Sequence, residues 1–226
     1  MAKTYTIAID GPAGAGKSTI ARALAKELGY YYVDTGAIYR TVASFLDLLG
    51  VSPKDVDGVE RYLDELTVEI QYDAEGKQHM IMNGMDVSDE IRTPDISQKA
   101  SLVSAHAIVR DMLLDMQRDV AKKHNVIMDG RDIGTVVLPR ATVKIFLTAS
   151  PEVRAQRRLD EMLAKGQQGN FQQVLADIKQ RDYQDSHRPI APLKQAKDAV
   201  LLDTSNLDID GVIAAMKKIV GEKISL

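Results

Sequence analysis

The feature that most constrains this chain lies near its amino end, where an apolar segment, residues 6–10, leads into a glycine-rich turn. An amphipathic helix is expected next, over residues 20–28, with apolar side chains on one face. The turn has the spacing of a P-loop, two glycines separated by four residues and followed by lysine and serine: Gly11, Pro12, Ala13, Gly14, Ala15, Gly16, Lys17, Ser18, Thr19. This order predicts a nucleoside triphosphate site.

The chemistry of such a turn explains its residue types. Glycines let successive backbone N–H groups point inward at phosphate oxygens, and the helix N-terminus adds partial positive charge. Lys17 is expected to reach the β and γ phosphates, and the Ser18 hydroxyl to bind Mg²⁺. A glycine-rich connection with a purely structural role is the alternative.

Length, charge and cysteine content exclude several classes of protein. With 226 residues the chain fits one domain with inserted lobes, and its net charge of −3 argues against nucleic acid as a partner. The absence of cysteine excludes disulfides and thiolate metal sites. We expect no membrane association and a cytoplasmic protein, because no signal-like or bilayer-length apolar run is present.

A second candidate ligand site follows the strand expected over residues 30–33. The turn from Asp34 to Arg40 opens a helix, and ligands of parallel sheets bind outside the carboxyl ends of the strands. Thr35, Tyr39 and Arg40 are therefore candidate ligand-binding residues. The alternative is that Tyr39 packs in the interior while Arg40 is a solvated charge.

The next part of the chain has the pattern of an insertion. Residues 67–72 and 79–82 predict an antiparallel hairpin, and helices are expected to begin near Pro94 and Ala107. Ser101 and Arg110 fall on these helices and could face a cleft. His79 lies on the hairpin with no evident partner, so we interpret it as a surface residue.

Polar residues again follow a core strand at residues 126–129. Asp129 ends this strand as the carboxylate of a Walker B element would, and it would orient Mg²⁺ directly or through water. Arg131 and Asp132 continue as a charged turn at the same edge of the sheet. A solvated charge pair is the alternative interpretation.

Two arginine-bearing helices are expected after residue 150. Arg154, Arg157 and Arg158 share one face of the first helix, and the second, from about Phe171, carries Arg181, Asp185 and Arg188. Joined by a glycine-containing loop, the two helices are typical of a mobile lid that closes over phosphates. Two exposed helices with surface salt bridges are the alternative.

The remaining elements complete an α/β pattern. Core strands are expected at residues 143–147 and 199–203, and a closing helix at residues 209–220. Alternation of strands and helices predicts a doubly wound parallel sheet with right-handed crossovers.

Together, the P-loop, residues 34–40, residues 129–135 and residues 181–188 closely resemble bacterial cytidylate kinases over essentially the whole chain. The resemblance implies a P-loop kinase fold: a five-stranded parallel sheet with an inserted monophosphate-binding lobe and a short helical lid. The chain, residues 1–226, would be a single domain. Its core would be residues 1–40, 120–150 and 190–226, its insertion residues 41–119 and its lid residues 151–189.

The resemblance also implies roles for individual residues. The monophosphate would lie near Thr35, Arg40, Arg131 and Arg181, the cytosine near Ser101, Arg110 and Asp132, and the sugar near Tyr39, Asp185 and Arg188. ATP would contact the P-loop, Arg154, Arg157 and Arg158, with Mg²⁺ at Ser18 and Asp129. The catalytic residues would be Lys17, Arg131, Arg157 and Arg181.

The implied reaction is transfer of the ATP γ-phosphoryl group to CMP or dCMP by a monomer. A GTPase is disfavoured because no guanine-reading Asn-Lys-x-Asp segment occurs. A P-loop kinase for another small acceptor, or a nucleotide-sensing binding module without turnover, remains as an alternative.

Overall fold

The computed structural model describes residues 4–224 and contains a central five-stranded sheet in the order β2-β6-β1-β7-β8. Every neighbouring pair of strands is parallel, which confirms the predicted fold class. The bounds of the strands are β1 Thr6–Asp10, β2 Tyr31–Asp34, β6 Val126–Gly130, β7 Val143–Thr148 and β8 Val200–Asp203.

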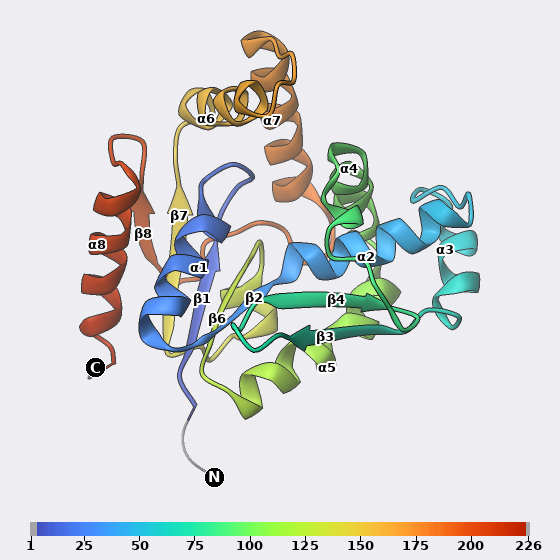
Figure 1. Ribbon diagram of the computed structural model, residues 1–226, viewed down its shortest axis with the longest axis horizontal. Helices are drawn as coiled ribbons and strands as arrows, with labels where there is room; N and C mark the ends of the chain where they lie inside the picture. The colour runs from blue at the N-terminus through green and yellow to red at the C-terminus, as the bar shows by residue number, and fades with distance from the viewer. Residues whose placement is uncertain (1–3, 225–226) are drawn as a thin grey trace.

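Helices cover both faces of this sheet (Figure 1). The alternation of side chains along a strand explains the two layers, because Ile7 and Ile9 of β1 belong to one buried cluster and Ala8 to the other. α1 (Lys17–Leu28) and α8 (Ile209–Gly221) pack on the first cluster, and α2 (Thr35–Leu48) and α5 (Ala107–Lys123) pack on the second.

The predicted insertion forms a second sheet of three antiparallel strands, β3 (Val68–Tyr72), β4 (Gln78–Met82) and β5 (Met85–Asp86). The hairpin is confirmed, whereas the two-residue strand β5 was not expected. α3 (Val56–Leu63), a 3₁₀ turn (Glu90–Arg92) and α4 (Pro94–Val103) accompany it. The Gln78 side chain joins this lobe to the core, because its Oε1 accepts the backbone N–H of Asp34 at 2.7 Å.

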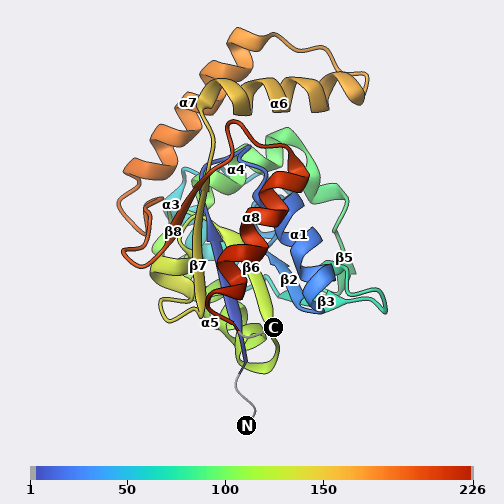
Figure 2. The same cartoon turned by 90° about the vertical axis from the view of Figure 1, so that its left-hand side faces the viewer.

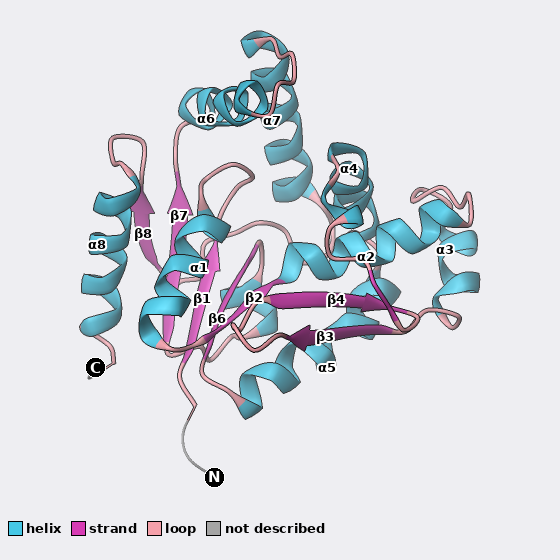
Figure 3. Ribbon diagram, viewed as in Figure 1, coloured by secondary structure: helices cyan, strands magenta, loops and turns pink. Residues whose placement is uncertain are grey.

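The two helices expected to form a lid, α6 (Pro151–Ala164) and α7 (Phe171–His187), stand beyond the carboxyl ends of the strands (Figures 2 and 3). They share a small core of Ala155, Val174 and Ile178. α6 begins after residue 150, as expected, and the Ser150 hydroxyl caps it by accepting the N–H of Val153 at 3.2 Å. Within residues 4–224 no helix is long and apolar enough to cross a membrane.

Candidate active site

A cavity of about 830 Å³ opens at the carboxyl ends of the core strands. Residues of the P-loop, α2, α4, α6 and α7 line it. Figure 1 shows where these elements lie. The sheet topology explains this location, since parallel strands bring all their carboxyl ends to one edge.

The P-loop packs tightly against β7. A Cβ atom on Gly11 would lie 1.9 Å from the carbonyl oxygen of Leu147, so only glycine fits at this position. Lys17 is 6% exposed, and its Nζ donates to the carbonyl oxygen of Pro12 at 2.8 Å. Burial, reinforced by the charge of Arg131, lowers the pKa of Lys17 to about 7. An arriving polyphosphate would favour the charged form of this amine.

Asp129 receives hydrogen bonds from two hydroxyl groups beside the P-loop. Ser18 Oγ donates to its Oδ2 at 2.8 Å, and Tyr32 Oη donates to its Oδ1 at 2.9 Å. Burial, together with the nearby charge of Asp34, raises the pKa of Asp129. Sequence reasoning missed Tyr32, whose only signal was its place in the strand that precedes Asp34.

The oxygens of Ser18 and Asp129 suit a hard cation such as Mg²⁺. In the described chain, no group of three or more His, Asp or Glu residues could hold a metal ion. This donor set fits Mg²⁺ bound mainly by phosphate oxygens and water, with few protein ligands.

Three arginines, Arg40, Arg131 and Arg181, line the cavity close to one another. Arg40 Nη2 donates to Asp34 Oδ2 at 3.0 Å, and Arg131 Nε donates to Asp185 Oδ2 at 2.7 Å. The buried Nε atoms of Arg40 and Arg181 have no partner among the described residues. Burial and the charge of Arg131 lower the pKa of Arg181 to about 10. An excess of buried positive charge with free donors is typical of an anion site.

Asp132 lines the cavity from the loop after β6. Its carboxylate accepts hydrogen bonds from Arg110, which is 6% exposed, and from Arg188 Nη2 at 3.2 Å. The Arg110 guanidinium also lies over the Tyr39 ring, 5.6 Å from its centroid. Tyr39 of α2, Arg110 of α5, Asp132 of the loop after β6 and Arg188, which directly follows α7, thus lie together, and their roles toward a substrate stay predictions.

The hydroxyl groups expected at the second ligand are already engaged in this structure. Thr35 Oγ1 donates to the backbone carbonyl of Asp129 at 2.7 Å, and Ser101 Oγ donates to Asp185 Oδ1 at 3.2 Å. Both residues line the cavity.

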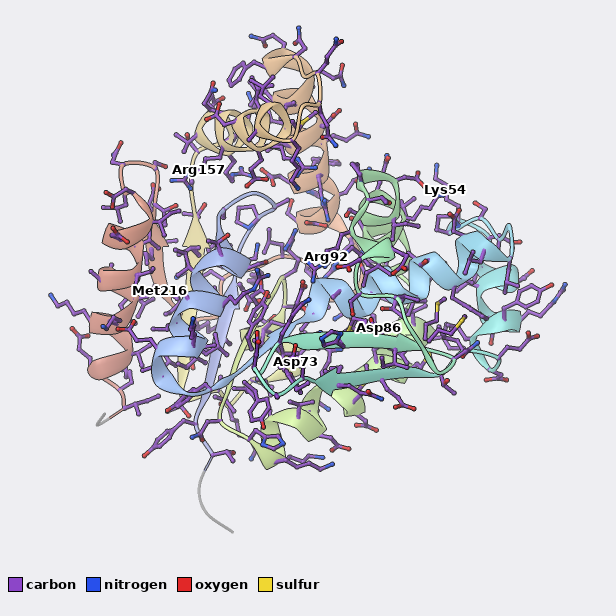
Figure 4. The ribbon with its side chains drawn as sticks, in the orientation of Figure 1. Lys54, Asp73, Asp86, Arg92, Arg157 and Met216 are labelled. Carbon is purple, nitrogen blue, oxygen red and sulfur yellow. The ribbon has the colours of Figure 1, made fainter. Side chains whose placement is uncertain are left out.

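The three arginines of α6 point to different places, although they share one helix face. Arg157 and Arg158 line the cavity, whereas Arg154 does not. Arg157 Nη2 donates to the carbonyl oxygen of Thr204 at 2.8 Å, so this side chain reaches from α6 to the end of β8 (Figure 4).

Arg154 is instead enclosed between the lid and the P-loop. It is 3% exposed, donates to the carbonyl oxygen of Ala13 at 3.0 Å, and forms two hydrogen bonds with Asp182 of α7. The expected contact of Arg154 with ATP stays a prediction; in this structure each of its three side-chain nitrogens donates to a protein oxygen. The structure gives it the role of a brace.

Comparison with known proteins adds an independent observation. The family model described as cytidylate kinase matches residues 7–222. A cytidylate kinase from Exiguobacterium sp. is 46% identical over 98% of this chain and 99% of its own length. One from Carboxydothermus hydrogenoformans is 48% identical over 96% and 97%, respectively.

A structural comparison supports the fold alone. A solved shikimate kinase from Bacteroides thetaiotaomicron aligns with a TM-score of 0.50 at 15% identity, covering 96% of this chain and 98% of that one.

Proposed function

The chain belongs to the cytidylate kinase family and phosphorylates CMP with ATP, and we propose that the cavity beside the P-loop holds both substrates during this transfer. The observation that carries the proposal is that Arg40 and Arg181 both line the P-loop cavity and each has a buried Nε without a hydrogen-bond partner among the described residues. They supply an anion site separate from the ATP phosphates, as a second, phosphorylated substrate requires.

The chemistry needs alignment and charge neutralisation more than proton transfer. The attacking atom is an oxygen of a phosphate monoester, which is already anionic near neutral pH. Catalysis then depends on holding donor and acceptor in line and stabilising the charge that spreads over the transferred group. Arg40, Arg131 and Arg181 would hold the acceptor phosphate, and Lys17 and Arg157 would face the ATP phosphates.

Mg²⁺ would be held at Ser18 and Asp129, with the remaining positions filled by phosphate oxygens and water. When bound, it supplies positive charge that neutralises the polyphosphate. The contribution of the chain is to orient the two oxygens, which Tyr32 supports by its hydrogen bond to Asp129.

Cytosine recognition would depend on Asp132, Arg110 and Ser101. Cytosine offers an amino donor at N4 and acceptors at N3 and O2, whereas uracil offers an acceptor at O4 and a donor at N3. The Asp132 carboxylate can accept from N4 of cytosine but would face O4 of uracil, and Arg110 can donate to N3 or O2. A mismatch leaves buried polar groups unpaired, which makes the selection strong.

The sugar would lie between this group and the phosphate site, near Tyr39, Asp185 and Arg188. Both CMP and dCMP would be acceptors, with Asp185 sensitive to the ribose hydroxyl. A monomer suffices, because a single chain supplies every residue named above. We propose that this monomer acts in the cytoplasm, where its nucleotide substrates are formed.

The test is release of ADP from Mg-ATP in the presence of CMP, dCMP, UMP, AMP or GMP. We expect CMP and dCMP to give the highest kcat/KM. Rapid ADP release with a non-nucleotide acceptor alone would identify a different small-molecule kinase. Nucleotide binding without ADP release, measured by calorimetry on the same preparation, would identify a binding module.

A further inference from the structure

The turn that follows Asp132 is held at both ends by charged residues outside the predicted site. Residues Ile133–Val137 form a single wide helical turn directly after Asp132, between β6 and β7. The turn includes the backbone of Asp132, whose carbonyl oxygen accepts the N–H of Val136 at 2.8 Å. A displacement of the turn therefore displaces Asp132.

Asp10 holds the amino end of this turn. It is the last residue of β1 and directly precedes Gly11 of the P-loop. Its Oδ1 accepts the N–H of Ile133 and its Oδ2 accepts the N–H of Gly134, both at 2.7 Å. The register of β1 on β6 brings it there, because Asp10 pairs with Gly130.

The contact between Asp10 and the turn is close and buried. Asp10 is 4% exposed, and a Cβ atom on Gly134 would lie 3.2 Å from its Oδ2. Burial raises the pKa of Asp10 to about 6, although the two N–H donors oppose this rise. Burying a carboxylate away from water is unfavourable unless hydrogen bonds compensate for the lost water. The N–H groups of Ile133 and Gly134 supply this compensation, so both must stay in place.

Arg118 of α5 holds the other end. Its Nη2 donates to the carbonyl oxygen of Val136 at 3.0 Å, and its Nε to that of Val137 at 3.1 Å. A carboxylate thus lies at the N–H end of the turn and a guanidinium at its carbonyl end, the arrangement that the peptide dipoles favour. Inside the turn, the buried Thr135 hydroxyl has no hydrogen-bond partner within the described residues, so it adds no anchor.

We propose that Asp10 and Arg118 are positioning residues that determine acceptor specificity by fixing Asp132 relative to the P-loop. This inference rests on the proposed function, in which Asp132 selects cytosine. Neither residue touches the acceptor, and each acts through the turn. Asp10 also directly precedes Gly11 of the P-loop. Its carboxylate therefore links the position of the P-loop to that of the turn that carries Asp132.

The test measures kcat/KM for CMP and for UMP in Asp10→Asn. Asparagine keeps the shape of the side chain, but its amide NH₂ faces one of the two N–H donors, which leaves that donor unpaired in the interior. We expect the CMP-to-UMP ratio to fall by about tenfold. The ratio is informative because both acceptors use the same ATP site and the same fraction of folded enzyme.

Arg118 provides an independent test with a conservative rescue. Arg118→Met removes both donor nitrogens and should lower the ratio, whereas Arg118→Lys keeps the charge and a single donor nitrogen and should recover part of it. The KM for ATP should change by less than about twofold in both variants.

Met216→Ala serves as a control for general loss of stability. Met216 is fully buried on α8, away from the cavity (Figure 4). This variant should unfold at a lower temperature with an unchanged CMP-to-UMP ratio.

The outcomes separate the two proposals. Unchanged ratios in folded Asp10→Asn and Arg118→Met would overturn the positioning role. If Asp10→Asn does not fold, the ratios measured for Arg118→Met and Arg118→Lys alone test the positioning role. Failure of the unmodified enzyme to prefer CMP would instead contradict the proposed function.

Discussion

Arg131 Nε donates to Asp185 Oδ2 at 2.7 Å, joining the loop after β6 to the lid helix α7 across the cavity. Asp185 is 4% exposed, and the charge of Arg131 lowers its pKa although burial opposes the shift. The core and the lid are therefore connected at the proposed acceptor site.

Replacing Asp185 tests the importance of this connection. In Asp185→Asn the Arg131 guanidinium loses its charged partner, so its orientation toward the acceptor is less defined. We expect kcat/KM for CMP to fall about tenfold or more, with little change in the KM for ATP. Steady-state kinetics with each substrate varied in turn measure both values. If the KM for ATP rises as much as the KM for CMP, the result would contradict a role of Asp185 that is limited to the acceptor.

Lys17 tests the assignment of the triphosphate site. Lys17→Met removes the amine expected to neutralise charge on the transferred group, and kcat should fall by about 10²-fold or more. The midpoint of thermal unfolding serves as the control, since the variant must remain folded. Near-normal turnover in the folded variant would refute the assignment.

Arg154 and Arg158 distinguish a structural brace from an exposed lid residue. Arg154→Met breaks the pair with Asp182 and should lower the free energy of unfolding by about 3 kcal/mol, the low end for buried pairs, because the Asp182 side chain is 24% exposed. The exposed pair of Arg158 with Glu161 is expected to contribute less than about 1 kcal/mol. Chemical denaturation of Arg154→Met and Arg158→Met compares them. Equal stability of the two variants would rule out the brace.

The core and the P-loop could be predicted from the sequence because their signals are local. Hydrophobic periodicity and turn residues identified the core strands, the helices and the inserted hairpin. The side chains that line the cavity were predicted partly from their places after the ends of strands and partly from the resemblance to cytidylate kinases. Their roles toward the substrates stay predictions. The contact partners of the Arg154 side chain could not be predicted. Side chains that share one helix face can still contact different parts of the fold, and the sequence does not say which parts lie beside each of them.

Residues that act through distant contacts were missed. Asp10 and Tyr32 contact residues that are about a hundred positions away in the sequence, and Arg118 reaches from a helix to a separate turn. No local sequence pattern identifies such contacts. His79 was interpreted as a surface residue because no partner was evident, and the structure leaves its side chain partly exposed but gives it two partners. Its Nδ1 lies 2.6 Å from Asp86 Oδ2 and its Nε2 lies 3.3 Å from Asp73 Oδ2, since the unpredicted strand β5 brings Asp86 next to β4 (Figure 4).

This cluster predicts a dependence of stability on pH. Hydrogen bonds to Asp86 and Asp73 raise the pKa of His79 in the folded state. Protonated His79 therefore stabilises the fold below its unfolded pKa of about 6.5, and this contribution is lost as the pH rises through the higher folded value. The difference in free energy of unfolding between the unmodified protein and His79→Gln should be larger at about pH 5.5 than at about pH 9. A difference that does not vary with pH would contradict the prediction.

Recognition of cytosine by Asp132, supported by Arg110 and Arg188, is the central claim. The most direct measurement is the ratio of kcat/KM for CMP to that for UMP in Asp132→Asn and in the unmodified enzyme. Asparagine can donate to O4 of uracil, so the account predicts that the ratio falls by about tenfold or more. A ratio that stays within about twofold of the unmodified value would show that another group selects the base.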